Sequence, residues 1–129
     1  GSKNVLELHG SVHRNFCQRC HKFFDAEYML HSEGVPKCDA CGGPVKPDVV
    51  LYEEGLDNDV IEQSLYYISH ADMLIIGGTA LVVYPAAGLV RYYGGHKLVL
   101  INKSATDMDK SADLVINEPI GEVFSRITL

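Results

Sequence analysis

The arrangement of the four cysteines constrains this chain more than any other feature of its sequence. They form two Cys-x-x-Cys pairs, Cys17 with Cys20 and Cys38 with Cys41, and seventeen residues separate the pairs. This spacing is typical of structural zinc sites, because each tight pair aims two thiolates at one ion and four thiolates complete a tetrahedron. Four protein ligands leave no open position for water or substrate. We therefore expect one structural Zn²⁺ that holds the fold together and does no chemistry.

Two other interpretations of the cysteines stay open at this point. Four unrelated buried thiols would bind no metal, but the paired spacing argues against them. A Cys-x-x-Cys pair can also be a redox motif, although such motifs adjoin a βαβ unit and this region has none in its pattern. Residues 15–47 contain all four cysteines and little apolar periodicity. They are expected to form a small zinc-binding module.

Charge and hydropathy exclude several classes of protein. The chain has 129 residues, of which 47% are hydrophobic, and this allows one compact domain with a small appended module. A net charge of -6 without any run of Lys or Arg argues against nucleic acid as a direct partner. No apolar run reaches the roughly 18 residues of a membrane span, and the first residues lack the apolar core of a signal peptide. We expect a cytoplasmic protein with no membrane partner.

Outside the cysteine region, short apolar runs alternate with helical patterns. Strands are predicted at 5–8, 49–52, 73–76, 97–101 and 113–116, and helices at 57–70, at 85–93 and after Pro119. The helix at 57–70 can be capped by Asp57 or Asp59. The wholly apolar run at 73–76 is expected to be buried on both faces of a parallel sheet. This order predicts an α/β fold: half of a Rossmann-like doubly wound parallel sheet, with the small four-cysteine zinc-binding module attached.

Three places could carry chemistry at the carboxyl ends of predicted strands, where α/β domains bind ligands. His9 follows the run at 5–8, although a histidine before glycine is also an ordinary turn residue. Gly78 and Thr79 follow the run at 73–76 and would let a phosphate or ribose approach the backbone, or would simply form a tight turn. Asn102 ends the run at 97–101 and can bind a ribose hydroxyl or form a turn.

Taken together, these motifs resemble one family, the sirtuins, which are NAD-dependent protein lysine deacylases. The similar stretches, besides the two cysteine pairs, are ELHGS at 7–11, KPDVV at 46–50, GTALVVYPAA at 78–87 and LVLIN at 98–102. They cover nearly the whole chain in order and spacing. The resemblance implies that an acyl-lysine carbonyl oxygen attacks ribose C1′ of NAD, that nicotinamide leaves, and that the acetyl group ends on ADP-ribose.

The resemblance also implies a role for particular residues. His9 would be the general base that activates a ribose hydroxyl. The residues implied to line the NAD site are Gly78, Thr79, Asn102, Lys103, Ser104 and Ile120. Those implied to contact the acetyl-lysine peptide, lying as an added strand, are Val50, Leu51, Tyr52, Glu53 and Val83. NAD would be the co-substrate, and acetylated lysine in proteins the substrate.

Three departures from the family pattern matter. Tyr52-Glu53-Glu54 stands where many sirtuins have Phe-Gly-Glu, and its two acids suggest a preference for basic residues beside the acetyl-lysine. Ala80 stands where a serine is common. The upstream half of the family, including its glycine-rich loop, has no counterpart here. We therefore expect a C-terminal portion of a sirtuin that is inactive alone. Residues 1–14 and 48–129 are expected to form part of the NAD-binding domain. Its missing N-terminal half would be the partner that activity requires.

Two alternative functions remain. The chain could be a non-enzymatic zinc module for interaction with other proteins, which would tolerate the loss of His9. Within the same family it could instead transfer ADP-ribose to a protein, which would leave the modification on the target and no acetylated ADP-ribose in solution.

Overall fold

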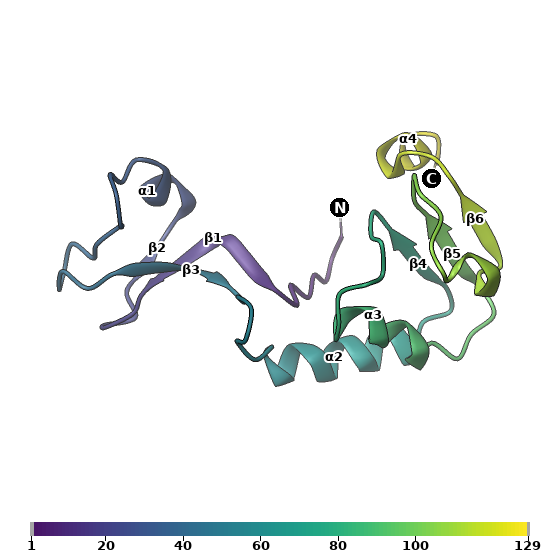
Figure 1. Cartoon of the computed structure of the whole chain (residues 1–129), viewed down its shortest axis with the longest axis horizontal. Helices are drawn as coiled ribbons and strands as arrows, with labels where there is room; N and C mark the ends of the chain where they lie inside the picture. Colours follow the sequence, from purple (N-terminus) through teal and green to yellow (C-terminus); the bar gives the residue numbers. More distant parts are fainter. Residues whose placement is uncertain (1, 129) are drawn as a thin grey trace. The chain divides into compact units, whose positions relative to one another are not determined.

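A computed structural model describes residues 2–128 of the chain (Figure 1). Gly1, the first residue of the predicted NAD-binding segment 1–14, and Leu129, the last residue of 48–129, lie outside the described residues. The chain divides into two compact units, Gly1–Val60 and Ile61–Leu129. None of the helices in residues 2–128 combines the length and the apolar composition that a membrane span requires.

The first unit is built on a small antiparallel sheet. Its strands are β1 (Gly10–Cys17), β2 (Phe23–Phe24) and β3 (Val45–Val49), in the order β2-β1-β3, and a short helix α1 (Ala26–Leu30) follows β2 (Figure 1). Asp25 caps α1 by accepting the N–H of Tyr28 at 2.8 Å. Strand β1 begins directly after His9 and ends at Cys17. This one strand therefore connects the candidate catalytic residue to the first cysteine pair.

The core of the first unit is small and contains sulfur. Its buried residues are Cys17, Phe24, Cys38 and Val45, with Tyr28, Met29 and Cys41 packed against them. Phe24 and Tyr28 stack with ring centroids 4.4 Å apart. A core of this size buries little apolar surface, so the thiols are expected to contribute to stability by binding a metal.

The strand predicted at 49–52 is wrong in position. Strand β3 ends at Val49, and residues 50–54 form a turn in which the N–H of Glu54 donates to the carbonyl of Leu51 at 3.1 Å. Pro47 lies within β3 although proline has no N–H to donate. The structure accommodates it because β3 lies at the edge of the sheet, where one side of a strand needs no ladder hydrogen bonds.

The strand predicted at 5–8 is also absent from the structure. Leu8 and His9 form a turn closed by a hydrogen bond of 2.8 Å from the N–H of Gly10 to the carbonyl of Glu7. His9 therefore precedes a strand, β1, instead of following one. The physical reason is pairing: β1 is flanked on both sides by β2 and β3, and residues 5–8 have no strand beside them among the described residues.

Helix α2 (Asn58–Ser69) confirms the helix predicted at 57–70. Asp57 caps it, since its Oδ1 accepts the N–H of Asp59 at 2.8 Å and that of Val60 at 3.3 Å. Of the two candidate caps, Asp57 therefore performs the role and Asp59 lies in the first turn.

The second unit contains the predicted parallel sheet. Strands β4 (Leu74–Gly77), β5 (Leu98–Ile101) and β6 (Leu114–Ile116) are parallel and follow one another in the order β4-β5-β6 (Figure 1). The helical segments of this unit after β4 are α3 (Ala86–Leu89), η1 (Val90–Tyr92), η2 (Asp109–Ser111) and α4 (Ile120–Ser125). The predictions at 73–76, 97–101, 113–116 and after Pro119 are confirmed to within one residue at most boundaries, and the helix at 85–93 divides into α3 and η1.

The expectation that residues 73–76 are buried on both faces is wrong. Ile76, Leu98 and Leu100 form a buried cluster on one face of the sheet. On the other face, Ile75 keeps 44% and Leu114 50% of its surface exposed. A strand alternates its side chains between the two faces, and only one face at this position is covered within the described residues.

Candidate functional site

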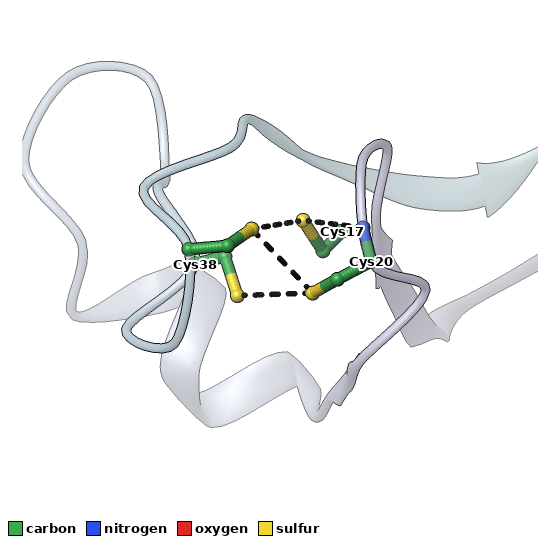
Figure 2. Close-up of side chains that lie close together, drawn as sticks. Cys17, Cys20 and Cys38 are labelled. Atoms are coloured by element: carbon green, nitrogen blue, oxygen red, sulfur yellow. Dashed lines mark hydrogen bonds between the residues drawn. The ribbon is translucent and has the colours of Figure 1, made fainter.

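The four cysteines converge in the first unit as the sequence predicts. Their Sγ atoms all lie within 4.8 Å of one another, and none of the cysteines is in a disulfide. Adjacent Sγ atoms are 3.5 Å apart between Cys17 and Cys41 and 3.6 Å apart between Cys20 and Cys38. Figure 2 shows Cys17, Cys20 and Cys38 pointing toward one another. Zn–S bonds of about 2.3 Å in a tetrahedron place sulfurs about 3.8 Å apart, so the cluster fits Zn²⁺.

Two similar turns present the thiols. We name residues 17–22 the first knuckle and residues 38–43 the second knuckle. In the first, the N–H of His21 donates to the carbonyl of Cys17 at 3.0 Å, and in the second, the N–H of Gly42 donates to the carbonyl of Cys38 at 2.8 Å. His21 and Gly42 both have positive φ, 58° and 70°. The equal turns explain why each pair directs both thiols to one side.

Gly43 shows that the space between the knuckles is filled. A Cβ at this position would lie 2.9 Å from Sγ of Cys17 and 3.3 Å from Sγ of Cys41. A side chain at residue 43 would therefore push against two of the sulfur atoms. The backbone of this glycine closes the thiol cluster on one side, which is a further sign that the four sulfurs form one site.

The thiols of the first knuckle differ in acidity. The N–H of Cys20, with that of Arg19, donates to the sulfur of Cys17 and lowers the pKa of Cys17 to about 6, against the opposing effect of burial. The N–H of Lys22 lowers the pKa of Cys20, but hydrogen bonds with the thiols of Cys41 and Cys17 raise it more, and the pKa of Cys20 is raised to about 12. One thiolate thus forms readily and suppresses ionisation beside it. A divalent cation bound by the sulfurs would offset the repulsion between neighbouring thiolates, so that both thiols could ionise.

His9 lies at the opposite end of strand β1 from the cysteines. Its ring is exposed, and its carbonyl oxygen accepts the N–H of Val50 at 3.1 Å. The next residue, Gly10, has φ 77°, and a Cβ there would lie 1.9 Å from the carbonyl oxygen of Asp48. Only glycine allows this approach of β1 to β3. Gly10 therefore fixes the turn that carries His9 against the start of the predicted peptide segment.

Arg14 supports the same turn and was missed by the sequence reasoning. Its Nε donates to Asp48 at 2.9 Å, and its Nη1 pairs with Glu7. These two hydrogen bonds raise the pKa of Arg14. Arg14 lies in a bulge, because the pairing of β1 with β3 shifts between Ser11 and Asn15. No local sequence pattern indicates these contacts, because the bulge that brings Arg14 to Asp48 arises from pairing between strands distant in the sequence.

The predicted peptide segment at 50–53 forms an exposed turn beside His9. Tyr52 is fully exposed and Leu51 is 56% exposed. Glu53 has φ 71°, a conformation that glycine adopts easily, and it stands where the family commonly has glycine. Glu54 accepts two hydrogen bonds of 2.9 Å from Lys46 and one of 2.9 Å from the N–H of Leu51. The charge of Glu54 is therefore neutralised within the unit.

The residues predicted to line the NAD site lie in the second unit, at the carboxyl ends of its strands. Nδ2 of Asn102 donates to the carbonyl of Thr79 at 2.8 Å and to that of Ser104 at 3.2 Å. The N–H of Gly78 donates to the carbonyl of Ile101 at 3.2 Å. Asn102 thus joins the loop after β4 to the loop after β5, which brings three predicted residues together.

Ile120 and Lys103 lie next to this group. A Cβ on Gly77 would lie 2.3 Å from Cδ1 of Ile120, so the isoleucine packs directly on the end of β4. Lys103 is exposed and adjoins Asn102 in sequence. Val83, the last predicted peptide residue, is 60% exposed in the loop that precedes α3. The first unit therefore contains His9, the segment 50–53 and the thiols, and the second contains the other predicted residues.

Comparison with known proteins identifies the family. The profile of the Sir2 family matches residues 1–85. The chain is 65% identical over 128 residues to the NAD-dependent protein deacetylase of Clostridium acetobutylicum and 64% identical to that of Clostridium perfringens. In both cases the match covers 98% of this chain and 52% of the relative. The chain thus spans about half the length of the curated relatives it matches.

Solved structures agree with this assignment. A structure described as Sir2 with a p53 peptide and NAD⁺ is similar to this chain with a TM-score of 0.85 and 39% sequence identity, and the match covers 98% of this chain and 55% of that one. A structure described as Sir2 bound to an acetylated peptide has the same TM-score at 38% identity, with the same coverage. The α/β fold with a parallel sheet and the four-cysteine cluster are those expected from the resemblance, and the chain belongs to the Sir2 family.

Proposed function

We propose that the complete protein carrying this chain is an NAD-dependent protein lysine deacetylase, which transfers the acetyl group to ADP-ribose and releases nicotinamide. The observation that carries the proposal is the junction made by Asn102, which joins the loops after β4 and β5 at the ligand-binding edge of a parallel sheet. The relatives named NAD-dependent protein deacetylase support it at up to 65% identity.

The hydrogen bonds of Asn102 define its proposed role. Both of its donated hydrogen bonds go to carbonyls of Thr79 and Ser104, so Oδ1 is the atom that can accept a hydrogen bond from a ribose hydroxyl. Gly78, with φ 65°, has open space where a Cβ would lie. Its backbone is accessible to a nucleotide. Lys103, Ser104 and Ile120 complete the proposed NAD site.

His9 is proposed as the general base. Its ring is exposed, while its backbone is tied to Val50, and Gly10 and Arg14 fix the turn around it. An imidazole suits this task because its ordinary pKa lies near neutral pH, so it can accept a proton from a ribose hydroxyl and release it again.

The acetyl-lysine peptide is proposed to lie along Val50, Leu51, Tyr52 and Glu53, with Val83 as a further contact. The exposed apolar side chains of Leu51 and Tyr52 support this, since they offer contact surface for a peptide. Because Lys46 neutralises Glu54, we assign the preference for basic flanking residues to Glu53 alone. Glu53→Gln should reduce the ratio of kcat/KM values for Arg-flanked over Glu-flanked peptides. An unchanged ratio would reject this assignment.

The remaining parts of the proposal concern organisation. Residues 15–47 form the zinc module, whose ligands are Cys17, Cys20, Cys38 and Cys41, and 1–14 with 48–129 belong to the NAD-binding domain. The zinc is structural. Four cysteines without a disulfide support a cytoplasmic location. The chain alone is proposed to be inactive and to need the remaining half of the protein.

The test compares this chain with a joined protein. In the joined protein, the part of the Clostridium acetobutylicum relative that lies outside the matched stretch is fused to the N-terminus of this chain. Each is incubated with NAD and an acetyl-lysine peptide, and the products are identified by mass spectrometry. We expect acetylated ADP-ribose from the joined protein, none from its His9→Ala variant, and none from the chain alone. His70→Ala is the matched control, because His70 is an exposed histidine at the end of helix α2.

The other outcomes separate the alternatives. ADP-ribose attached to the peptide or to the joined protein itself, with no acetylated ADP-ribose in solution, would establish ADP-ribosyl transfer instead. Absence of any product from a folded, zinc-loaded joined protein would favour a zinc module for protein interaction. Product that survives His9→Ala would reject His9 as the base.

A further inference from the structure

Side chains that are not metal ligands join the two knuckles. Nζ of Lys22 donates to both carboxylate oxygens of Asp39, at 2.6 and 2.8 Å. Nη1 of Arg19 donates to the carbonyl of Cys41 at 3.1 Å. Each contact runs from a basic side chain of the first knuckle to an acceptor in the second. The two segments are distant in sequence, so these contacts fix the knuckles relative to each other.

Lys22 is held at two further points. Its carbonyl oxygen accepts the N–H of Cys17 at 2.9 Å, and its Nζ lies 5.4 Å from the ring centroid of Phe24. Phe24 is 6% exposed and belongs to the core of the unit. Asp39 directly follows Cys38 in the second knuckle. The ion pair therefore connects the backbone around one thiol to the backbone around another, and its cation rests on the core.

This placement matters for the loss of zinc. An ion held by four thiolates leaves only after the thiolates detach in turn, and a knuckle that swings away removes two ligands together. A contact that keeps the knuckles together while one thiolate is detached favours rebinding of that thiolate. We infer that the Lys22–Asp39 ion pair is a clasp that slows the release of zinc from the four-cysteine site. The inference rests on the zinc site of the proposed function.

A clasp and a purely electrostatic role predict opposite results for Asp39→Asn. Zn²⁺ with four thiolates carries a net charge of about -2, and a cation beside it would retain the metal by charge alone. In that case, Asp39→Asn would leave the positive charge of Lys22 without a compensating negative charge, and zinc would be released more slowly. A clasp is instead broken by the same substitution, and release becomes faster.

The experiment measures zinc release from the zinc-loaded 129-residue chain in excess chelator, followed by the absorbance of a zinc-binding dye. The variants are Lys22→Met, Asp39→Asn and the double variant. The controls are Lys37→Met and Glu33→Gln, which change the charge of the same unit equally at exposed positions. Metal analysis first establishes one zinc per chain, and circular dichroism compares the folds of all variants.

We expect each single variant to release zinc roughly 2- to 5-fold faster than the wild type, as befits an exposed ion pair. The double variant should be no faster than the faster single variant, because both remove the same interaction. The controls should match the wild type. At an ionic strength of about 1 M, where screening is strong, the difference should vanish.

Two results would overturn the clasp. One is release from Lys22→Met and Asp39→Asn at the rate of the wild type and the controls. The other is slower release from Asp39→Asn, which would assign the effect to charge alone. A wild-type chain that binds less than one zinc would reject the four-cysteine zinc site itself, and with it this inference, while leaving the proposed roles of His9 and Asn102 to their own tests.

Discussion

Two of the four buried residues in the core of the first unit are cysteines, whereas the buried cluster of the second unit consists of aliphatic side chains. Burial of apolar surface stabilises a fold by roughly 25 cal/mol per Å², so the second unit can draw on this effect. The first unit has less to bury and gathers four thiols instead. The difference teaches that one chain of the Sir2 family combines two kinds of core: the unit that carries His9 has a core containing the thiols of a candidate zinc site, and the unit that carries the proposed NAD residues has an aliphatic core.

The largest expected effect is loss of a thiol ligand. Cys38→Ser removes a buried ligand and should forfeit a large part of the ~10–16 kcal/mol that zinc binding supplies to small metal modules. Amide hydrogen exchange should show loss of protection in β1 and β3 and retained protection in β4 to β6. Uniform loss in both units would contradict the comparison, and so would unchanged protection in the first.

The reverse experiment truncates the aliphatic core. Leu100 is 1% exposed, and Leu100→Ala should lower the free energy of unfolding of the second unit by about 2–5 kcal/mol through lost burial and a cavity. Urea unfolding measures the change, and metal analysis should still find one zinc per chain. If the variant loses its zinc as well, the two units are not organised separately.

A smaller, local effect is expected at the turn that carries His9. Gly10→Ala places a Cβ against the carbonyl of Asp48 and forces a positive φ on alanine. The strained backbone alone costs ~1–3 kcal/mol. Gly34→Ala is the matched control, since Gly34 has φ 68° and open space around its Cβ position. Urea unfolding should show a larger loss for Gly10→Ala, with zinc retained, and equal losses would reject the close approach.

The smallest effect concerns the acid beside the peptide segment. Hydrogen bonds from Lys46 and from the N–H of Leu51 lower the pKa of Glu54 below its ordinary 4.5. The lowered pKa means that Glu54 contributes stability above its unfolded-state pKa, and that this contribution disappears as the pH falls through the folded-state value. NMR titration of the Glu54 carboxyl should give a midpoint below 4.5, and Lys46→Met should raise it. A midpoint unaffected by Lys46→Met would show that the ion pair is absent in solution.

The features that the sequence predicted correctly are encoded locally. The spacing of each Cys-x-x-Cys pair directs two thiols to one side. The apolar runs of β4 and β5 can be predicted as strands without knowledge of the strands that pair with them. Asp57 likewise caps the helix that begins directly after it. In each case a few neighbouring residues determine the structure.

The features that the sequence did not predict depend on distant pairing. Strand β3 includes Pro47, which is tolerated only because the strand lies at the edge of its sheet. Arg14 reaches Asp48 across a bulge that exists only once β1 and β3 are paired. The exposure of Ile75 depends on what covers the sheet, which the continuous apolar run at 73–76 does not specify.

The most direct test of the account uses the joined protein and separates binding from chemistry. Isothermal titration measures NAD affinity, and product formation is followed in parallel, for His9→Ala in the first unit and Asn102→Ala in the second. We predict that His9→Ala keeps the wild-type affinity for NAD while product formation falls by roughly 10²-fold or more, and that Asn102→Ala loses affinity. Loss of NAD affinity in His9→Ala, or full product formation by that variant, would contradict the division of roles between the two units.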